Sequence, residues 1–406
     1  MPVRLNEVPE QATPPDKPSS QRWLKCLAGM LAVCCLFIYF SGQRMNTPGF
    51  WLFAVVAPVS LWLIAAWVRA MIYLLGYIRV NAWNRSREAF ILAELRRGRR
   101  ALQILRATGI TAHLQLGDAF SAFPLEALIK NESVLSTRNT WKGERMRHSR
   151  LPASPDINVA DFLSRIFSKL VSELAVSLHK YPDDQPVTLL FEADTSLPEQ
   201  LVSSLWRDAW KTCGIRQQTE DIDGHGLAVV DRWLDHRIRE KSLLLVVALQ
   251  VAPENPQDTG ETVAALLLGN RLTQNILTPR ALLHRPEQNG SQPLNENIAQ
   301  ALDWGPVEPD ELHHLWQAGL SDQQQSAIAA LNGRSPLEGV EMNSNLYDLD
   351  KTLGHTGCAA PWLAIAAASQ AAEQMQAAHL IVSGERNTDL VWSTVVSPCA
   401  PEKEMC

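Results

Sequence analysis

The sequence predicts an α/β protein in which an N-terminal two-helix transmembrane hairpin is followed by a layered α/β soluble domain. Two apolar runs near the start of the chain predict the hairpin. Behind them, the patterns of buried strands and amphipathic helices alternate, which is typical of helices packed on a mainly parallel sheet. An alanine-rich segment near the C-terminus predicts a helix with little side-chain bulk, able to approach a sheet closely. With 406 residues, the chain has room for one large domain or two ordinary ones beyond the membrane.

Both apolar runs are long enough to cross a bilayer. We expect transmembrane helix 1 over residues 23–42 and transmembrane helix 2 over residues 50–78. A helix rises about 1.5 Å per residue, so roughly 20 apolar residues cross a hydrocarbon core of about 30 Å. A cleaved signal peptide has a shorter apolar stretch and a small-residue cleavage site, which the first run lacks. The turn between the runs, residues 43–48, is short enough to force an antiparallel hairpin.

Basic residues predict the orientation of the hairpin. They flank the two runs, whereas the turn between the runs holds only Arg44. The flanking residues are Arg4, Lys17, Arg22 and Lys25 before or at the first run, and Arg79, Arg85, Arg87, Arg96, Arg97, Arg99 and Arg100 after the second. We therefore expect both flanks on the cytoplasmic side and the hairpin tip outside. Arg69 either marks the interface, with residues 70–78 lying along the membrane surface, or belongs to a longer tilted helix.

Composition suggests the remaining boundaries. Residues 1–22 are rich in Pro, Ser and Gln and are expected to form a disordered cytoplasmic tail. Residues 79–150 are expected to be a basic juxtamembrane helix, continuing to Arg106, and a linker with a polar loop from residue 139. The α/β domain is expected over residues 151–406. The net charge is −6 and the basic residues lack interleaved aromatics, so we expect no nucleic-acid partner.

Within the domain, helices are predicted where apolar residues recur at helical spacing and strands where short runs are continuously apolar. The predicted elements are a helix at 158–180, a strand at 186–193, a helix at 198–213 capped by Ser196, a strand near Ile215, a helix at 227–239, strands at 242–252 and 262–268, three short helices within 295–331, the alanine-rich helix ending at Gln376, and strands at 379–383 and 390–396.

No complete catalytic or ligand-binding motif emerges. The patterns GxxxxGK[ST] and GxSxG are absent, and Gly224-His225-Gly226 is too short to cradle a phosphate. The pair His313-His314, and His225 with Asp221 and Asp223, resemble solvated turns more than a metal site. We therefore expect neither a metal nor a cofactor.

The seven cysteines are scattered without a CxxC pair, which indicates neither a disulfide framework nor a zinc site. Cys213 falls at the C-terminal end of a predicted helix, where the helix dipole has the wrong sign to stabilise a thiolate. Cys358 lies beside His355 in sequence but not at a predicted strand-to-helix elbow.

The C-terminal segment resembles the last part of the thiolase-like fold of β-ketoacyl synthases. The resemblance is carried by Lys351, by Gly354-His355-Thr356 and by the small-residue helix that begins near Ala359. In those enzymes the histidine stabilises the thioester oxyanion and the lysine orders the site, although here the spacing of Lys351 and His355 departs from theirs. They also need a nucleophilic cysteine at a strand-to-helix turn, which the sequence does not supply. We therefore expect a non-enzymatic protein that keeps His355 and Lys351 only as a remnant.

The whole chain resembles the type VI secretion lipase adaptor proteins. The resemblance is carried by the two spans with the exit NAWNRSREAF, by VTLLFEADTSLPEQ and SLLLVVALQ, and by LGHTGCAAPWLAIAAASQ. It implies an adaptor anchored in the bacterial inner membrane, with its soluble domain in the cytoplasm. Such an adaptor would bind a phospholipase effector and target it to the spike protein. Two alternatives stay open: a membrane-bound acyl-transfer enzyme that uses His355 and Lys351, and an envelope sensor or interaction protein.

Overall fold

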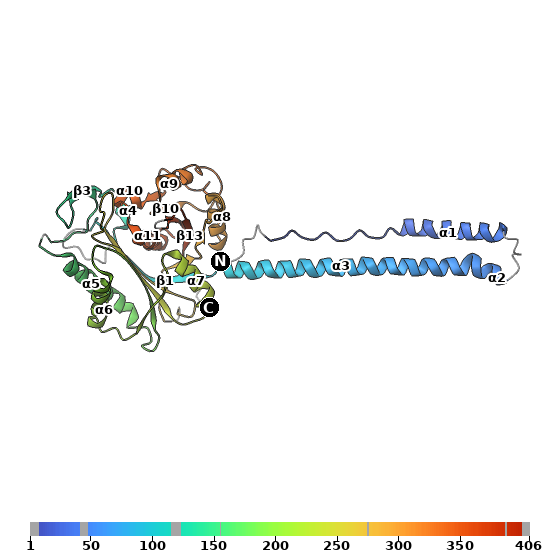
Figure 1. Cartoon of the computed structure of the whole chain (residues 1–406), viewed down its shortest axis with the longest axis horizontal. Coiled ribbons are helices and arrows are strands. Elements are labelled where there is room, and N and C mark those ends of the chain that lie inside the picture. The colour runs from blue at the N-terminus through green and yellow to red at the C-terminus, as the bar shows by residue number, and fades with distance from the viewer. Residues whose placement is uncertain are drawn as a thin grey trace. The chain divides into compact units, whose positions relative to one another are not determined.

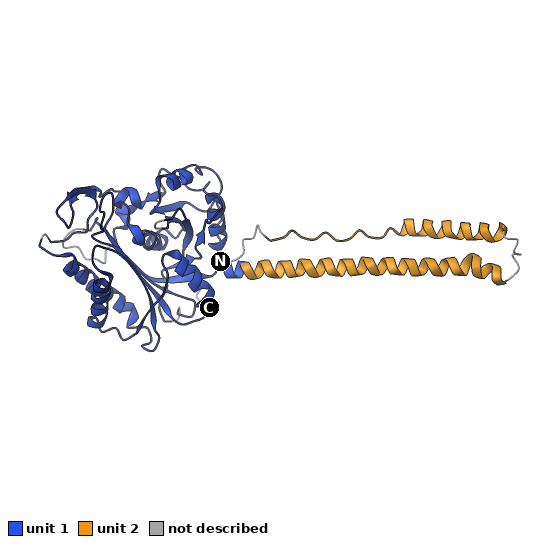
Figure 2. Ribbon diagram, in the orientation of Figure 1, with its two compact units in different colours: residues 1–2, 95–406 blue, residues 3–94 orange. Residues whose placement is uncertain are grey.

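A computed structural model of the chain describes residues 8–40, 48–114, 123–154, 156–273, 276–385 and 388–399. The chain divides into two compact units, one of residues 3–94 and one of residues 1–2 and 95–406 (Figure 2). We call them the helical unit and the α/β unit.

The helical unit contains two long apolar helices. The first is α1 (Ser20–Phe40), and the second runs without a break through α2 (Pro48–Trp51), the π-helix η2 (Leu52–Val56) and α3 (Ala57–Gly98). Both helices are long and apolar enough to be candidate membrane spans. They are paired antiparallel, because Ile38 packs near Phe50 whereas the indole of Trp62 donates a hydrogen bond to the carbonyl of Trp23. Residues 43–47 of the expected turn lie outside the described residues, and Pro48 begins α2.

Large apolar side chains on both helices are exposed. The exposed fractions reach 81% for Phe40 and 65% for Leu75, a surface that suits lipid better than water. Helix α3 continues through Arg69 as a single helix, as the longer-helix alternative requires.

The described part of the N-terminal tail, residues 8–19, makes hydrogen bonds to α3. It forms no regular structure before Ser20, but Ala12 exchanges two hydrogen bonds with the side-chain amide of Asn84, at 3.0 and 3.1 Å. The guanidinium of Arg87 also donates to the carbonyl of Pro9. The proline-rich tail is therefore held against α3.

The α/β unit is built on one eleven-stranded sheet in the order β11-β10-β12-β13-β8-β1-β7-β6-β4-β5, with β9 (Glu287–Gln288) paired to β13. The first half comprises β1 (Ala101–Ile110), β4 (Val187–Asp194), β5 (Thr219–Asp221), β6 (Leu243–Gln250) and β7 (Thr262–Gly269). The second comprises β8 (Ala281–His284), β10 (His314–Ala318), β11 (Leu346–Asp348), β12 (His379–Gly384) and β13 (Val391–Pro398). The halves join where β1 pairs antiparallel with β8.

The two halves have the same topology. In each, the first strand neighbours the fifth, followed across the sheet by the fourth, the second and the third. In each, the second, third and fourth strands are parallel and the fifth is antiparallel to its neighbours. The sheet is therefore mixed, and the expectation of a mainly parallel sheet is wrong.

The helices form layers around the two half-sheets. The outer helices are α5 (Val159–Leu178) and α6 (Glu199–Thr212) over the first half, and α8 (Leu294–Trp304) and α9 (Asp322–Ala329) over the second. Helices α7 (Leu227–His236) and α11 (Ala360–Met375) belong to the core cluster shared by both halves (Figure 1). Successive residues of β6 point alternately into this shared core and toward α5 and α6, which explains its unbroken apolar sequence.

The alanine-rich helix α11 contacts strands of both halves, including β1, β7, β12 and β13. Its alanines from Ala364 to Ala372 are fully buried. Close approach to the sheet was predicted from the lack of side-chain bulk, and the burial of these alanines confirms it.

Other predictions from sequence need correction. The helix expected to continue to Arg106 ends at Gly98, and the chain then enters β1, so the α/β unit begins at Leu95 rather than at residue 151. The leucines of that segment fit a helix and a buried strand equally well. The expected loop from residue 139 contains a hairpin of β2 (Ser136–Asn139) and β3 (Arg145–His148).

Three local assignments also differ. Ile215 is not in a strand, and the edge strand β5 begins four residues later. Helix α6 has Pro198 at its N-cap without a side-chain cap, so Ser196 does not cap it. The middle of the three expected short helices is the strand β10.

Candidate functional site

A cleft of about 390 Å³ lies where the N-terminal ends of α7 and α11 meet. Its lining comes from both halves of the sheet: Phe191, Glu192 and Ala193 of β4, the turn Gly224–Leu227, the turn residues Gly357 and Cys358 with Pro361, and the segment Ser383–Glu385 with Trp392. Two helices that start at one cavity direct the positive ends of their dipoles toward it.

The turn before α7 contributes His225 to the cleft. Its imidazole Nε2 lies 3.3 Å from Oε1 of Glu385, which follows β12 in the second half. The Glu385 carboxylate is largely buried and also accepts hydrogen bonds from the side chains of Trp392 and Gln288, at 3.2 and 3.0 Å. The side chain of His225 is 76% exposed, and the fixed carboxylate gives its ring one oriented partner.

The turn before α11 contributes Cys358. This residue is half-buried in a 3₁₀ turn (η3, Gly357–Ala359), and its Sγ lies 3.4 Å from the carbonyl oxygen of Leu249. Gly357 has φ of +54°, and a Cβ there would lie 2.1 Å from Oε1 of Gln250. Glycine is therefore required to place Cys358 at the start of the helix, which sequence reasoning did not anticipate.

Glu192 holds the two turns together. One carboxylate oxygen accepts a hydrogen bond from the backbone N–H of Gly226 at 2.7 Å, and the other accepts from the indole of Trp362 on α11 at 2.6 Å. A single side chain of β4 thus fixes the starts of both central helices.

The two residues carried over from the synthase resemblance lie outside this cleft. Lys351 is 71% exposed and pairs with Asp348 at 3.0 Å. His355 is 58% exposed, and its Nδ1 lies 3.5 Å from Asp350, whose carboxylate accepts hydrogen bonds from the backbone of Gly319 and Leu320. The hydrogen bond with Asp350 raises the pKa of His355, with burial opposing it. The structure brings neither residue to the residues lining the cleft.

The histidines considered as metal ligands are also separate. His313 contacts the carbonyl of Gly339, and His225 faces Glu385 rather than Asp221 or Asp223. The described residues contain no group of three or more His, Cys, Asp or Glu side chains that could hold a metal ion.

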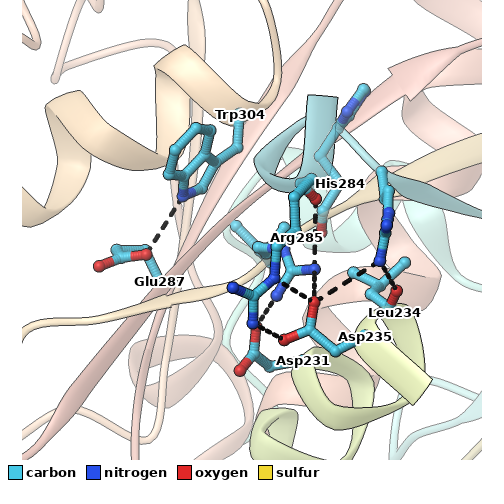
Figure 3. A network of polar contacts seen from close by, with 10 residues as sticks. Asp231, Leu234, Asp235, His284, Arg285, Glu287 and Trp304 are labelled. Atoms are coloured by element: carbon cyan, nitrogen blue, oxygen red, sulfur yellow. Dashed lines mark hydrogen bonds and ion pairs between the residues drawn. The ribbon is translucent and has the colours of Figure 1, made fainter. Parts of the chain in front are cut away.

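A second polar cluster joins the two halves away from the cleft (Figure 3). Arg285, which follows β8, is fully buried and donates to Asp231 and Asp235 on α7. Asp235 also accepts two hydrogen bonds from Arg97, at 2.9 and 2.7 Å. Desolvation opposes the charge on Asp235, but hydrogen bonds from Arg97 and Arg285 prevail and hold its pKa well below the usual range. Because its groups pair with one another and Arg285 is inaccessible, this cluster is structural.

Solved structures of condensing enzymes share this architecture. A ketosynthase/chain length factor of ishigamide matches with a TM-score of 0.52 at 12% identity, covering 74% of this chain and 100% of that one. Human mitochondrial 3-ketoacyl-CoA thiolase matches with a TM-score of 0.48 at 9% identity, covering 75% and 100%. The 3-oxoacyl-(acyl carrier protein) synthase III of Pseudomonas aeruginosa PAO1 matches with a TM-score of 0.42 at 12% identity, covering 74% and 99%. No protein-family model and no curated protein sequence matches the chain.

The fold is thiolase-like. This confirms the layered α/β thiolase-like fold expected from sequence. It contradicts the expectation of a non-enzymatic protein, because the structures that share the fold are condensing enzymes. That expectation relied on the absence of a cysteine at a strand-to-helix turn and placed Cys358 away from such an elbow. In the structure Cys358 lies in η3, directly before α11.

Sequence reasoning missed Glu192, Glu385 and the position of Cys358. A usable signal was present, because Gly-His-Gly directly precedes α7 and Gly-His-Thr-Gly-Cys lies just before α11. The convergence of Glu385 on His225 could not be seen, since 160 residues separate them.

Proposed function

We propose that this protein is an acyl-transfer or condensing-type enzyme whose chemistry takes place in the cleft between α7 and α11. Cys358 would be the nucleophile, His225 the general base and Glu385 the residue that positions His225. The observation that carries the proposal is the presence, in one cavity, of a helix-start cysteine and a histidine–carboxylate pair. These are the residue types that thiol-based acyl transfer requires.

The proposed step is a transthioesterification. His225 takes the proton from Sγ of Cys358, and the thiolate attacks the carbonyl carbon of an acyl thioester. The bond between that carbon and the sulfur of the leaving thiol breaks, and the proton returns from His225 to the leaving thiolate. The acyl group is then held as a thioester on Cys358. The positive end of α11 would stabilise the negative charge that develops during the attack.

The lining suits an acyl chain. Phe191, Leu227 and Trp392 contribute apolar walls beside the polar groups at the helix starts. Apolar walls with a few fixed polar groups are typical of small-molecule sites.

The proposal is tested with the full chain in detergent and acetyl-CoA as the probe. We expect release of free CoA thiol, abolished in Cys358→Ala and retained in Cys213→Ala, which removes another half-buried cysteine outside the cleft. Equal rates in all three proteins, or no release by any of them, would count against the proposed chemistry.

A second function, the type VI secretion adaptor, is favoured by one observation. The three sequence segments that carry the adaptor resemblance in the soluble part lie side by side, because β4 and β6 are neighbouring parallel strands and η3 contacts both. Two of them, β4 and η3, also line the cleft. A phospholipase effector bound there would be presented to a spike protein. We expect full-length protein to co-purify with a phospholipase effector, and Glu192→Ala to weaken the complex by loosening both helix starts. If Glu192→Ala leaves the complex unchanged, the cleft does not bind the effector.

We also propose that the two apolar helices anchor the protein in the bacterial inner membrane, with the α/β unit in the cytoplasm. The supporting observations are two helices of sufficient length and the basic flanks of the hairpin. A cysteine-labelling experiment checks this: an impermeant maleimide applied to intact cells should leave a cysteine introduced at Arg165 unlabelled. Labelling of this cysteine in intact cells would show that the α/β unit lies outside the cytoplasm and would contradict the proposed orientation.

A further inference from the structure

The β2–β3 hairpin concentrates positive charge on an acidic unit. Residues 136–150 hold five Arg and Lys and one Glu, whereas the 300 residues after Arg106 hold 23 Arg and Lys against 38 Asp and Glu. The hairpin lies outside the main sheet and forms a two-stranded sheet of its own. Its cations are therefore not explained by the packing of the core.

Three of these cations are available for a partner. Arg138, Lys142 and Arg145 are exposed, and no ion pair is recorded for them among the described residues. Arg147 differs, since it pairs with Asp258 at 3.0 Å. Arg138 is oriented by a hydrogen bond of 2.6 Å to the hydroxyl of Ser136.

The turn of the hairpin, which contains Trp141, is anchored to the rest of the α/β unit. The indole of Trp141 donates to the buried carboxylate of Glu261 at 2.5 Å, and the same carboxylate accepts from the backbone of Ala252 and Leu151. The guanidinium of Arg150 lies 3.9 Å from the Trp141 ring centroid. The three exposed cations are thus presented on a pre-organised support, which lowers the entropy lost on binding.

We propose that this hairpin is a docking surface for an acidic protein partner. Single-stranded nucleic acid fits poorly, because base stacking needs an accessible aromatic face and Trp141 is already occupied by Arg150 and Glu261. A lipid surface would attract these cations by charge alone, since no large apolar side chain of the hairpin is exposed to insert between lipids. A fixed array of cations on a short hairpin matches carboxylates of an acidic protein by charge complementarity.

The test compares charge reversals in the full chain in detergent, using a fluorescein-labelled poly-glutamate peptide as the probe. The hairpin variant is Arg138→Glu, Lys142→Glu and Arg145→Glu. The matched control reverses three exposed cations on α5 and α6: Arg165→Glu, Arg207→Glu and Lys211→Glu. Because the changes lie on the surface, circular dichroism should be unchanged in both.

We expect the hairpin variant to bind the peptide about tenfold more weakly, the control to bind as the native protein does, and binding to weaken with added salt. Equal losses in both variants would overturn the proposal. Hairpin-dependent binding to phosphatidylglycerol vesicles or oligothymidylate that exceeds binding to poly-glutamate would also overturn it, in favour of a membrane or a nucleic acid. So would a hairpin-dependent change in oligomeric state by sedimentation, which would assign the surface to a second copy of the chain.

Discussion

The two halves of the α/β unit share one topology but differ at the turns that begin their central helices. The turn before α7 has Gly226 with φ of +56°, and the turn before α11 has Gly357 with φ of +54°. Both turns line the cleft, yet one supplies a histidine and the other a cysteine. The comparison teaches that the duplicated fold creates two equivalent helix starts, and that the candidate chemistry needs one residue from each. Neither half alone contains the set.

The largest loss of stability is expected from removing the buried ion pairs of Arg285, which connect the two halves. We expect Arg285→Met to lower the free energy of unfolding by about 3–5 kcal/mol, because Asp231 and Asp235 lose a fully buried counter-charge. Arg216→Met, which removes an exposed pair with Asp183, should cost about 0–1 kcal/mol. Urea denaturation of the protein in detergent, followed by tryptophan fluorescence, measures both. Similar losses in the two variants would mean that the cluster adds little.

Substituting alanine for Gly226 or for Gly357 compares how strongly the two turns depend on glycine. Gly226→Ala should cost about 1–3 kcal/mol from backbone strain alone, since φ of +56° with ψ of −157° suits only glycine and nothing lies within 4 Å of a Cβ at that position. Gly357→Ala should cost about 1 kcal/mol more, because the added Cβ must also displace Gln250, whose side chain donates to the carbonyls of Gly260 and His355. Equal losses of unfolding free energy in the two variants, measured by urea denaturation, would contradict the expected steric difference between the turns.

Acid should destabilise the second half through its buried histidines. Burial, aided by the neighbouring His314, lowers the pKa of His379 to about 3. The unfolded chain binds this proton near pH 6.5 and the folded chain does not, so stability is complete above pH 6.5 and falls as the pH drops toward 3. For His379 alone the loss is about 2 kcal/mol at pH 5.

His379→Gln retains an acceptor for the indole of Trp316 but does not titrate. Its stability should therefore fall less between pH 7 and pH 5 than that of the native protein. An identical fall in the two proteins, measured by urea denaturation at both pH values, would contradict this assignment.

The smallest effect is expected at His355, where the sign is opposite. Its pKa is raised by Asp350, so the ion pair stabilises the fold below pH 6.5 and is lost as the pH rises through the folded pKa. Because the side chain is 58% exposed, solvent screening limits the contribution to a few tenths of a kcal/mol. His355→Gln should therefore match the native stability at pH 9 and fall slightly below it at pH 6. A loss of CoA-thiol release in this variant would restore His355 to the catalytic site.

Much of this fold was predictable from the sequence, and the reasons are local. The continuous apolar run of β6 predicts a strand buried on both faces, and the alanines of α11 predict a helix packed closely against its neighbours. The segment Ala101–Arg106 was not predictable, because its leucines fit a helix until β7 and β8 pair with it. The same holds for the candidate site: cysteine and histidine were visible as residues, but their approach depends on the duplication, which no local pattern reveals.

The most direct test of the cleft asks whether an acyl group reaches Cys358. The full chain in detergent is incubated with acetyl-CoA, quenched in acid and digested, and the cysteine-containing peptides are compared by mass spectrometry. We predict an acetyl group on the peptide that contains Cys358 and none on the peptide that contains Cys213, with the adduct strongly reduced in His225→Ala. Absence of the Cys358 adduct, or the same yield on both cysteines, would contradict the claim that the two halves together form an acyl-transfer site in the cleft.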